Sequence, residues 1–385
     1  MSVLELALQR NKYKHLSDEE WRWFLQQVEG RERTADKLPT FAAIDDWWYP
    51  VRLSCEQCSS ELTARYKAEI ISSDRLSRAN LGFQVSNFLD LTGGYGVDTY
   101  FLSKQFEQAD YVEQNPELCR IAEHNFSLID NRKPIIVHNT SAEEFIASAG
   151  EYDLIFADPA RRDAHGGKVF KLADCTPNIV ELLPELLKHS KQLMLKLSPM
   201  LDISQAIKEL SVFSLQWSVY VVAVKNEVKE VLLLSGGNGT ITAIDLAEPE
   251  KAFVFTREEE QVCPAGIGDL SLVIGNFLYE PNAAILKAGA YKLVAQRFGL
   301  QKLDVNTHLY ASDQLVENFP GRVWEIKSKI ENQKSKIEQA NVLVRNYPLT
   351  PEQLKKKLHL RDGGTAYVIG CRVAGKPTLF QAERV

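Results

Sequence analysis

Between about residues 84 and 236, short apolar runs alternate with segments that have helical spacing. The runs are VSNFLDL, ADYVEQ, PIIVHN, YDLIFADP and QLMLKLSP, and polar capping residues open the helical segments between them. Continuous apolar strands separated by helices predict a parallel sheet that is covered by helices on both faces. Two further strand-like runs, in LQWSVYVVAVKNEVKEVLLLSG, break the alternation and predict an antiparallel pair at the edge of that sheet.

The first strand of this region runs into the glycine-rich sequence DLTGGYGVD, which begins at Asp90. In doubly wound sheets, ligands bind at the carboxyl ends of the strands, and the first turn is where a nucleotide meets the backbone. A dinucleotide motif would have its third glycine where Thr99 stands. The carboxylate of Asp90 would also repel a phosphate and attract an ammonium group. The loop therefore favours a ligand with a positive charge.

Polar residues also follow the second and third strands. Glu113 ends the second strand 23 residues after Asp90, a spacing at which an acid commonly accepts both ribose hydroxyls of a nucleoside. Ser141 and Ala142 follow the third strand, where an adenine edge would lie. A nucleoside with a cationic amino-acid portion fits this pattern, and S-adenosylmethionine is such a molecule. The predicted cofactor-binding residues are Asp90, Leu91, Thr92, Gly93, Gly94, Gly96, Glu113, Ser141 and Ala142.

DLTGGYGVD resembles the first motif of class I S-adenosylmethionine-dependent methyltransferases, with Thr92 where the first glycine often stands. This similarity covers about residues 84–236. More narrowly, DPARRD, KVFKLAD and NVLVRNYPLTPEQLKKKL are similar to a largely uncharacterised bacterial family that joins such a domain to a ferredoxin-like segment and a THUMP-like module. The resemblance implies an α/β fold with a Rossmann-like sheet, parallel with an antiparallel edge pair, and a role in RNA modification.

The expected domains are a helical N-terminal domain over 1–75, the methyltransferase domain over 76–236, a ferredoxin-like α+β segment over 237–320 and a basic THUMP-like domain over 321–385. In the first, Ser17 and Glu20 form the pattern of a capping box, and Gly30 is expected to close the helix. A single helix closed by Gly299 is expected in EPNAAILKAGAYKLVAQRFGL, and a lysine-rich helix is expected to open the last domain.

The family resemblance puts Asp158 and Pro159, after the fourth strand, where the sulfonium methyl group of the donor should point. Relatives that methylate exocyclic amines carry an Asp or Asn, two prolines and an aromatic residue there. This chain instead has Ala160 and Arg161 after the first two positions. The reaction needs an acceptor for the hydrogens of the amine and in-line approach of nitrogen to methyl. The predicted catalytic residues are Asp158, Pro159 and Arg161.

The missing aromatic residue leaves stacking on a flipped base to another side chain, for which Phe170 is a candidate, and Arg161 or Arg162 could hold a phosphate. Cys175 is interpreted as a packing residue because the neighbouring Asp174 disfavours a thiolate nucleophile. Two other patterns are weaker. EQCSSELTARYK could cover the donor through Ser59, Ser60 or Lys67, and Lys196 with Ser198 ends the fifth strand, but all of these also fit capping or surface positions.

Charge is segregated along the chain. The whole sequence has a net charge of −6, whereas residues 321–385 hold 13 Lys or Arg against 6 Asp or Glu. A basic terminal module attracts a polyanion through its local field, so RNA is the expected partner, with a charge-rich solvated helix as the alternative.

No apolar run reaches the roughly 18 residues of a membrane span, and the N-terminal residues lack a secretory signal pattern. Six scattered cysteines do not suggest a disulfide framework, and the pair Cys55 and Cys58 lacks the further ligands of a zinc site. These observations predict a cytoplasmic protein with no metal and no membrane partner.

The sequence thus predicts an S-adenosylmethionine-dependent methyltransferase that acts on an exocyclic or ring nitrogen of a base in tRNA or rRNA. Two alternatives stay open. One is an NAD(P)-dependent oxidoreductase, which the missing third glycine and Asp90 disfavour. The other is a non-catalytic RNA-binding protein that retains the methyltransferase fold.

Overall fold

The computed structural model describes residues 3–79, 87–129, 134–161, 171–211, 215–264, 275–330 and 337–385. The chain divides into two compact units. Unit 1 consists of Met1–Gln216 with Leu232–Gly236, and unit 2 consists of Trp217–Val231 with Gly237–Val385. Within the described residues, no helix has the combination of length and apolar character that a bilayer span requires.

The described residues form a nine-stranded sheet in the order β11-β10-β8-β9-β7-β4-β1-β2-β3. Its strands are β1 (Asn87–Asp90), β2 (Gln108–Glu113), β3 (Ile135–Asn139), β4 (Leu154–Ala157), β7 (Leu193–Leu197), β8 (Trp217–Val224), β9 (Glu227–Ser235), β10 (Thr240–Asp245) and β11 (Phe253–Thr256). The first five of these strands pair in parallel. Lys225 and Asn226, both with positive φ, join β8 and β9 in the tight turn of a hairpin. The predicted α/β fold, a mostly parallel sheet with added edge strands, is confirmed.

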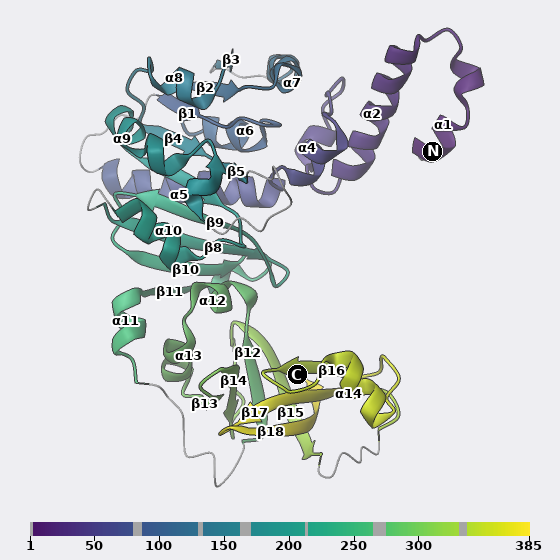
Figure 1. Cartoon of the computed structure of the whole chain (residues 1–385), viewed down its shortest axis with the longest axis vertical. Helices are drawn as coiled ribbons and strands as arrows, with labels where there is room; N and C mark the ends of the chain where they lie inside the picture. The colour runs from purple at the N-terminus through teal and green to yellow at the C-terminus, as the bar shows by residue number, and fades with distance from the viewer. Residues whose placement is uncertain are drawn as a thin grey trace. The chain divides into compact units, whose positions relative to one another are not determined.

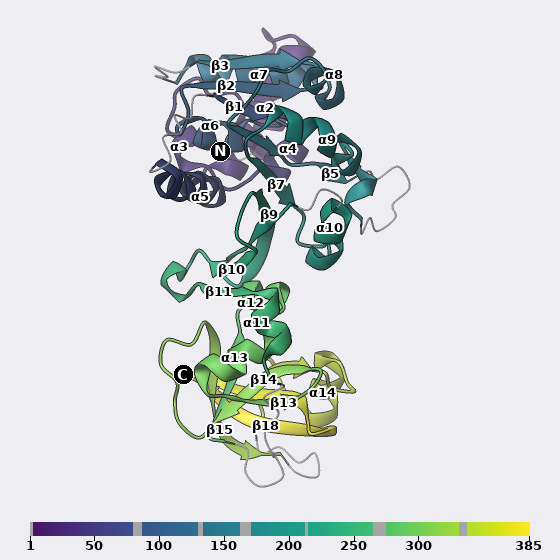
Figure 2. The same cartoon turned by 90° about the vertical axis from the view of Figure 1, so that its left-hand side faces the viewer.

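Helices cover both faces of this sheet (Figure 1). One face carries α5 (Glu61–Ala79), α6 (Val97–Ser103) and α7 (Pro116–Ser127), and the other carries α8 (Ala142–Ile146), α9 (Ile179–His189) and α10 (Ile203–Leu210). Figure 2 shows α5 and α6 on the opposite side of the strands from α9 and α10. A short two-stranded ribbon of β5 (Ala160–Arg161) and β6 (Cys175–Thr176) follows β4.

The N-terminal segment is helical, as predicted, with α1 (Val3–Ala7), a 3₁₀ turn (Arg10–Tyr13), α2 (Asp18–Thr34), α3 (Pro39–Ala42) and α4 (Arg52–Gln57). The capping box of Ser17 and Glu20 at the start of α2 is confirmed. The predicted end at Gly30 is wrong, because α2 continues to Thr34. Gly30 instead lets Tyr49 pack closely, since a Cβ atom at residue 30 would lie 2.2 Å from the Cβ of Tyr49.

Unit 2 contains a seven-stranded sheet in the order β13-β14-β12-β15-β18-β17-β16. Its strands are β12 (Phe277–Pro281), β13 (Gln301–Asp304), β14 (Thr307–Ser312), β15 (Gly321–Lys329), β16 (Asn341–Arg345), β17 (Ala366–Val373) and β18 (Lys376–Arg384). The helical elements are a 3₁₀ turn (Pro249–Lys251), α11 (Arg257–Val262), α12 (Ala283–Ala288), α13 (Tyr291–Phe298) and α14 (Pro351–Leu358). Strands β12 and β15 pair antiparallel, so segments on both sides of residue 320 share one sheet.

Two helix predictions in unit 2 are wrong. Residues Gly321–Lys329 form β15 and not a helix, because Trp324 is fully buried in the sheet and pairs with Leu278 and Arg384 on the neighbouring strands. The segment expected to be one helix ending at Gly299 is two helices. Gly289, with φ of +81°, ends the first of them in a left-handed conformation.

Candidate active site

The carboxylate of Asp90 organises the glycine-rich loop between β1 and α6. Its oxygens accept hydrogen bonds from the backbone N–H of Thr92 at 3.0 Å and from the hydroxyl of Thr99 at 2.6 Å. Thr99, in place of the third glycine of a dinucleotide motif, thus stabilises an acid beneath the loop. Burial raises the pKa of Asp90 to about 7, against the lowering effect of these two hydrogen bonds.

Glycines are required in this loop for both space and conformation. A Cβ atom at Gly93 would lie 2.1 Å from the ring of Tyr111. Gly94 and Gly96 have φ of +56° and +80°, which favours glycine. The Tyr111 hydroxyl donates to the carbonyl of Gly94 at 2.5 Å, so β2 supports the loop from below.

Glu113, at the end of β2, is the second acid of the site. Its Oε2 accepts the N–H of Gly94 at 3.0 Å and its Oε1 accepts the N–H of Asn115 at 2.8 Å. Each carboxylate oxygen has further acceptor capacity, which two ribose hydroxyls could use. The backbone bonds hold the carboxylate beside the loop, as expected for a group that fixes a nucleoside.

These groups border a cavity of about 330 Å³ in unit 1, within the size range of small-molecule sites. It is lined by Ser54, Gln57, Cys58, Ser59, Asp90–Asp98, Val112–Gln114, Leu118, Thr140, Ala142, Glu143, Phe156, Asp158, Ala160, Thr176, Pro177 and Lys196. The predicted cofactor-binding residues are therefore together at one cavity, except Ser141. Ser141 caps α8 by accepting the N–H of Glu144 at 3.2 Å.

Asp158 lies at the end of β4, and its backbone N–H donates to the hydroxyl of Thr92 at 2.7 Å. This bond joins the predicted catalytic segment to the glycine-rich loop between β1 and α6, which we call the donor loop. Pro159 is half-buried and is not among the described residues that line the cavity. The backbone of Arg161 pairs with Cys175 in the β5–β6 ribbon. The side chain of Arg161, and all of Arg162 and Phe170, lie outside the described residues.

A buried ionic network meets the cavity beside Asp158. Lys196, at the end of β7, contacts the Asp158 carboxylate and lies 3.4 Å from Oδ2 of Asp98. Oδ1 of Asp98 lies 3.2 Å from Nζ of the fully buried Lys67. The Ser59 hydroxyl donates to Asp98 at 2.7 Å. Burial alone would raise the pKa of Asp98, but the two lysines and the Ser59 hydrogen bond lower it on balance.

Sequence reasoning missed Asp98, although it noted Ser59, Lys67 and Lys196 as weak candidates. The sequence signal for Asp98 was its position in the first turn of α6, where an acid commonly serves as a cap. In the structure, Gly96 is the N-cap residue and Asp98 is buried. Thr176 and Pro177 also line the cavity without a motif that marks them, and Gln57 lines it from the segment EQCSSELTARYK.

The other weak candidates have local roles. Ser60 accepts the N–H of Thr63 at 3.2 Å, and Ser198 accepts the N–H of Met200 at 3.3 Å. Cys175 is a buried residue of β6 and pairs with Arg161 in the β5–β6 ribbon. Groups of three or more metal-ligating side chains are absent from the described part of the chain.

Known proteins share this architecture. A family model for a ferredoxin-like domain matches residues 277–320, and a model for a THUMP-like domain matches residues 317–384. A crystal structure of a putative methyltransferase from Porphyromonas gingivalis W83 is similar with 33% sequence identity and a TM-score of 0.82, covering 96% of this chain and 92% of that one. The chain belongs to the family of this methyltransferase. The predicted enzyme class and the ferredoxin-like and THUMP-like modules are confirmed.

Two uncharacterised S-adenosylmethionine-dependent methyltransferases from Mycobacterium tuberculosis strains are each 21% identical to the present chain over 371 residues. The match covers 91% of this chain and 92% of each relative. The predicted cofactor, S-adenosylmethionine, is confirmed. Asp90 and Glu113, the two carboxylates predicted to bind this cofactor, lie on adjacent strands and line the same cavity.

Proposed function

We propose that this methyltransferase transfers the methyl group of S-adenosylmethionine to an exocyclic or ring nitrogen of a base in tRNA or rRNA, in the cytoplasm. The observation that carries the proposal is the position of Asp158. Its backbone is tied to the donor loop through Thr92, and its carboxylate borders the same cavity as the donor residues. A group that accepts the hydrogens of an amine is thereby next to the donor.

The donor supplies an electrophilic methyl group, and the chain supplies orientation. The Asp90 and Glu113 carboxylates hold the donor loop and offer acceptors for the ammonium and ribose groups. Asp158 accepts a hydrogen bond from the amine and so directs its nitrogen toward the methyl group. In this role Asp158 need not gain a full proton in the transfer step, because the methylated nitrogen loses its proton to solvent afterwards.

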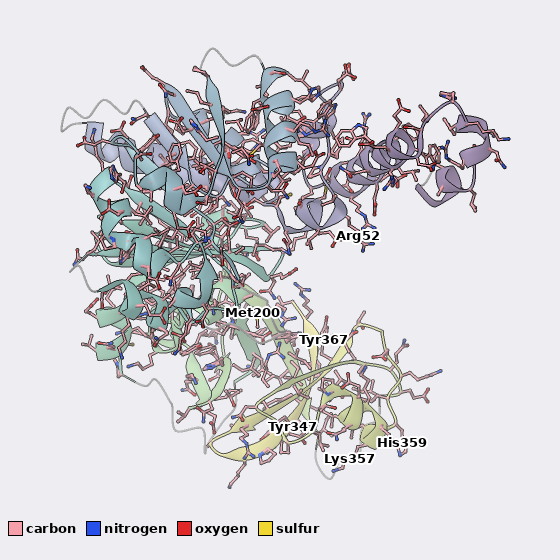
Figure 3. All side chains as sticks on the ribbon, turned by 45° about the horizontal axis from the view of Figure 1, so that its top comes forward. Arg52, Met200, Tyr347, Lys357, His359 and Tyr367 are labelled. Atoms are coloured by element: carbon pink, nitrogen blue, oxygen red, sulfur yellow. The ribbon has the colours of Figure 1, made fainter. Side chains whose placement is uncertain are left out.

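The basic C-terminal segment supports RNA as the substrate. Lys356 and Lys357 are exposed on α14 in unit 2, and His359 follows at the end of that helix (Figure 3). Lys355, on the same helix, is paired with Asp362 at 2.7 Å. Unpaired surface lysines release counterions when they bind phosphates, which is the main source of affinity for RNA.

The test is methyl transfer from tritiated S-adenosylmethionine to total RNA from a strain that lacks the gene, followed by mass spectrometry of the nucleosides. The wild-type protein should yield a methylated base that the deletion strain lacks. D158N should lower the rate by about 100-fold or more, because amine orientation is lost, while binding of S-adenosylhomocysteine is unchanged. D36N is the control, since Asp36 is an exposed acid of the N-terminal segment.

Methylated ribose in place of a methylated base would contradict the choice of nitrogen. If the wild-type protein and D158N both bind RNA but neither transfers a methyl group, the non-catalytic RNA-binding alternative would be favoured.

A further inference from the structure

The ionic network beside the cavity contains two lysines and two aspartates, so its charges balance. Lys67 is fully buried, and the side chains of Lys196 and Asp98 are about one-tenth exposed, with relative accessibilities of 12% and 10%. Buried charges are stable only when they are paired and hydrogen-bonded. Each group in this network therefore restricts the position of its neighbours.

Asp158, Lys196 and Asp98 of this network line the cavity, and Asp158 is the most exposed of the three, with its side chain 38% exposed. Lys196 contacts Oδ2 of this carboxylate. Among the described residues, the structure assigns no hydrogen-bond partner to the other oxygen, Oδ1. A carboxylate held at one oxygen presents the second in a defined direction.

We propose that Lys196 is a positioning residue that orients the Asp158 carboxylate toward the methyl acceptor, and that Ser59, Lys67 and Asp98 fix Lys196 in turn. The ammonium of Lys196 lies 3.1 Å from the Ser59 hydroxyl and 3.4 Å from Asp98. Ser59 precedes α5 and Lys67 is on it, so α5 and the residues just before it complete the proposed catalytic site. This inference rests on the catalytic role given to Asp158 above.

The role of Lys196 differs from that of a proton acceptor. A lysine that took the proton of the acceptor would have to be neutral and would touch the acceptor itself. Lys196 is instead engaged by two carboxylates, which favour its charged form. Lys196 also lines the cavity, but in this proposal it acts through Asp158.

The test compares K196M, K196R and K191M in the RNA methylation assay described above. K196M should lower kcat by about 10- to 100-fold, since small misplacement of a reacting group has effects of this size, with the affinity for S-adenosylhomocysteine unchanged. K196R keeps the positive charge and should recover part of the rate. K191M is the matched control, because Lys191 pairs with the buried Asp153 at 2.6 Å near the opposite ends of β4 and β7.

A double-mutant cycle with D158N separates positioning from direct contact. If Lys196 acts through Asp158, the double variant D158N/K196M should be as fast as D158N within about twofold. An equal loss from K196M in both backgrounds would overturn the proposal and indicate that Lys196 touches the acceptor.

A crystal structure of K196M with S-adenosylhomocysteine tests the inference without RNA. The Asp158 side chain should change its orientation, and an unchanged carboxylate would overturn the positioning role. If the wild-type protein methylates no RNA but Asp158 turns in K196M, the RNA proposal fails while the positioning role stands.

Discussion

At the scale of single residues, the cavity of unit 1 is bordered by acids at strand ends. The positions of Asp90 and Glu113 could be predicted because each ends an apolar run, and parallel strands bring those ends to one edge of the sheet. Asp98 could not be predicted in this way. Its partners come from distant parts of the chain, and Lys196 is 98 residues away, so only the folded structure pairs them.

Asp90 should make the stability of the donor-free protein depend on pH. Its pKa of about 7 in the folded chain is well above the roughly 3.9 of an unfolded Asp, so the folded form keeps a proton that the unfolded form loses. The contribution of Asp90 to the free energy of unfolding is therefore greatest below about pH 4 and decreases as the pH rises to about 7. D90N should remove this loss, which is at most about 4 kcal/mol.

Urea unfolding of the wild-type protein and D90N at pH 5 and pH 8 measures the effect. The variant should gain stability relative to the wild type at pH 8. Equal differences at both pH values would show that Asp90 does not titrate in this range.

At the scale of helices and strands, alternating apolar runs predicted the parallel core of the sheet well because β1, β2, β4 and β7 are mostly buried, whereas the edge strand β3 is partly exposed. The same reasoning failed for β15, because its exposed lysines suggested a charged, solvent-facing helix, whereas the strand contains the buried Trp324. It also missed the break at Gly289, since a helix that ends in a left-handed glycine and a continuous helix have similar apolar spacing. The spacing of apolar residues within a segment does not show which other helices or strands pack against that segment.

The pairing of Lys67 on α5 with Asp98 on α6 should stabilise the contact between these helices. K67M leaves Asp98 buried with one fewer cation, so the free energy of unfolding should fall by about 3 kcal/mol. R65M, on the same helix, breaks the pair of Arg65 with Glu61, in which the Arg65 side chain is 49% exposed, and should cost about 1 kcal/mol or less. Chemical denaturation of both variants measures the difference. Equal losses would contradict a structural role for the buried pair.

At the scale of the whole molecule, the chain combines an acidic majority with a basic C-terminal segment. The sequence showed this charge segregation directly, whereas the residues that remain available for RNA emerge only from the fold. Lys355 is paired with Asp362, and Arg361 lies 3.1 Å from Glu338. Lys356 and Lys357 are the better candidates for phosphate contacts because they are exposed on α14.

The double variant K356Q/K357Q should weaken RNA binding and reduce the slope of log affinity against log salt concentration by roughly 1 to 2, since each lost phosphate contact removes about 0.7 to 0.9. Binding of S-adenosylhomocysteine should not change. The control K188Q/K208Q removes the same charge from α9 and α10 of unit 1. Fluorescence anisotropy with a labelled tRNA at several salt concentrations measures the slope, and similar slopes for both variants would argue against α14 as a contact surface.

The antiparallel pairing of β12 with β15 also has a consequence for recombination between relatives. The two C-terminal family models meet near residue 320, but a crossover there would combine strands of one sheet from different parents. Their buried side chains, such as Leu278 against Trp324, would then have to match by chance. A viable chimera is expected to exchange the whole segment from β12 onward as one inherited unit.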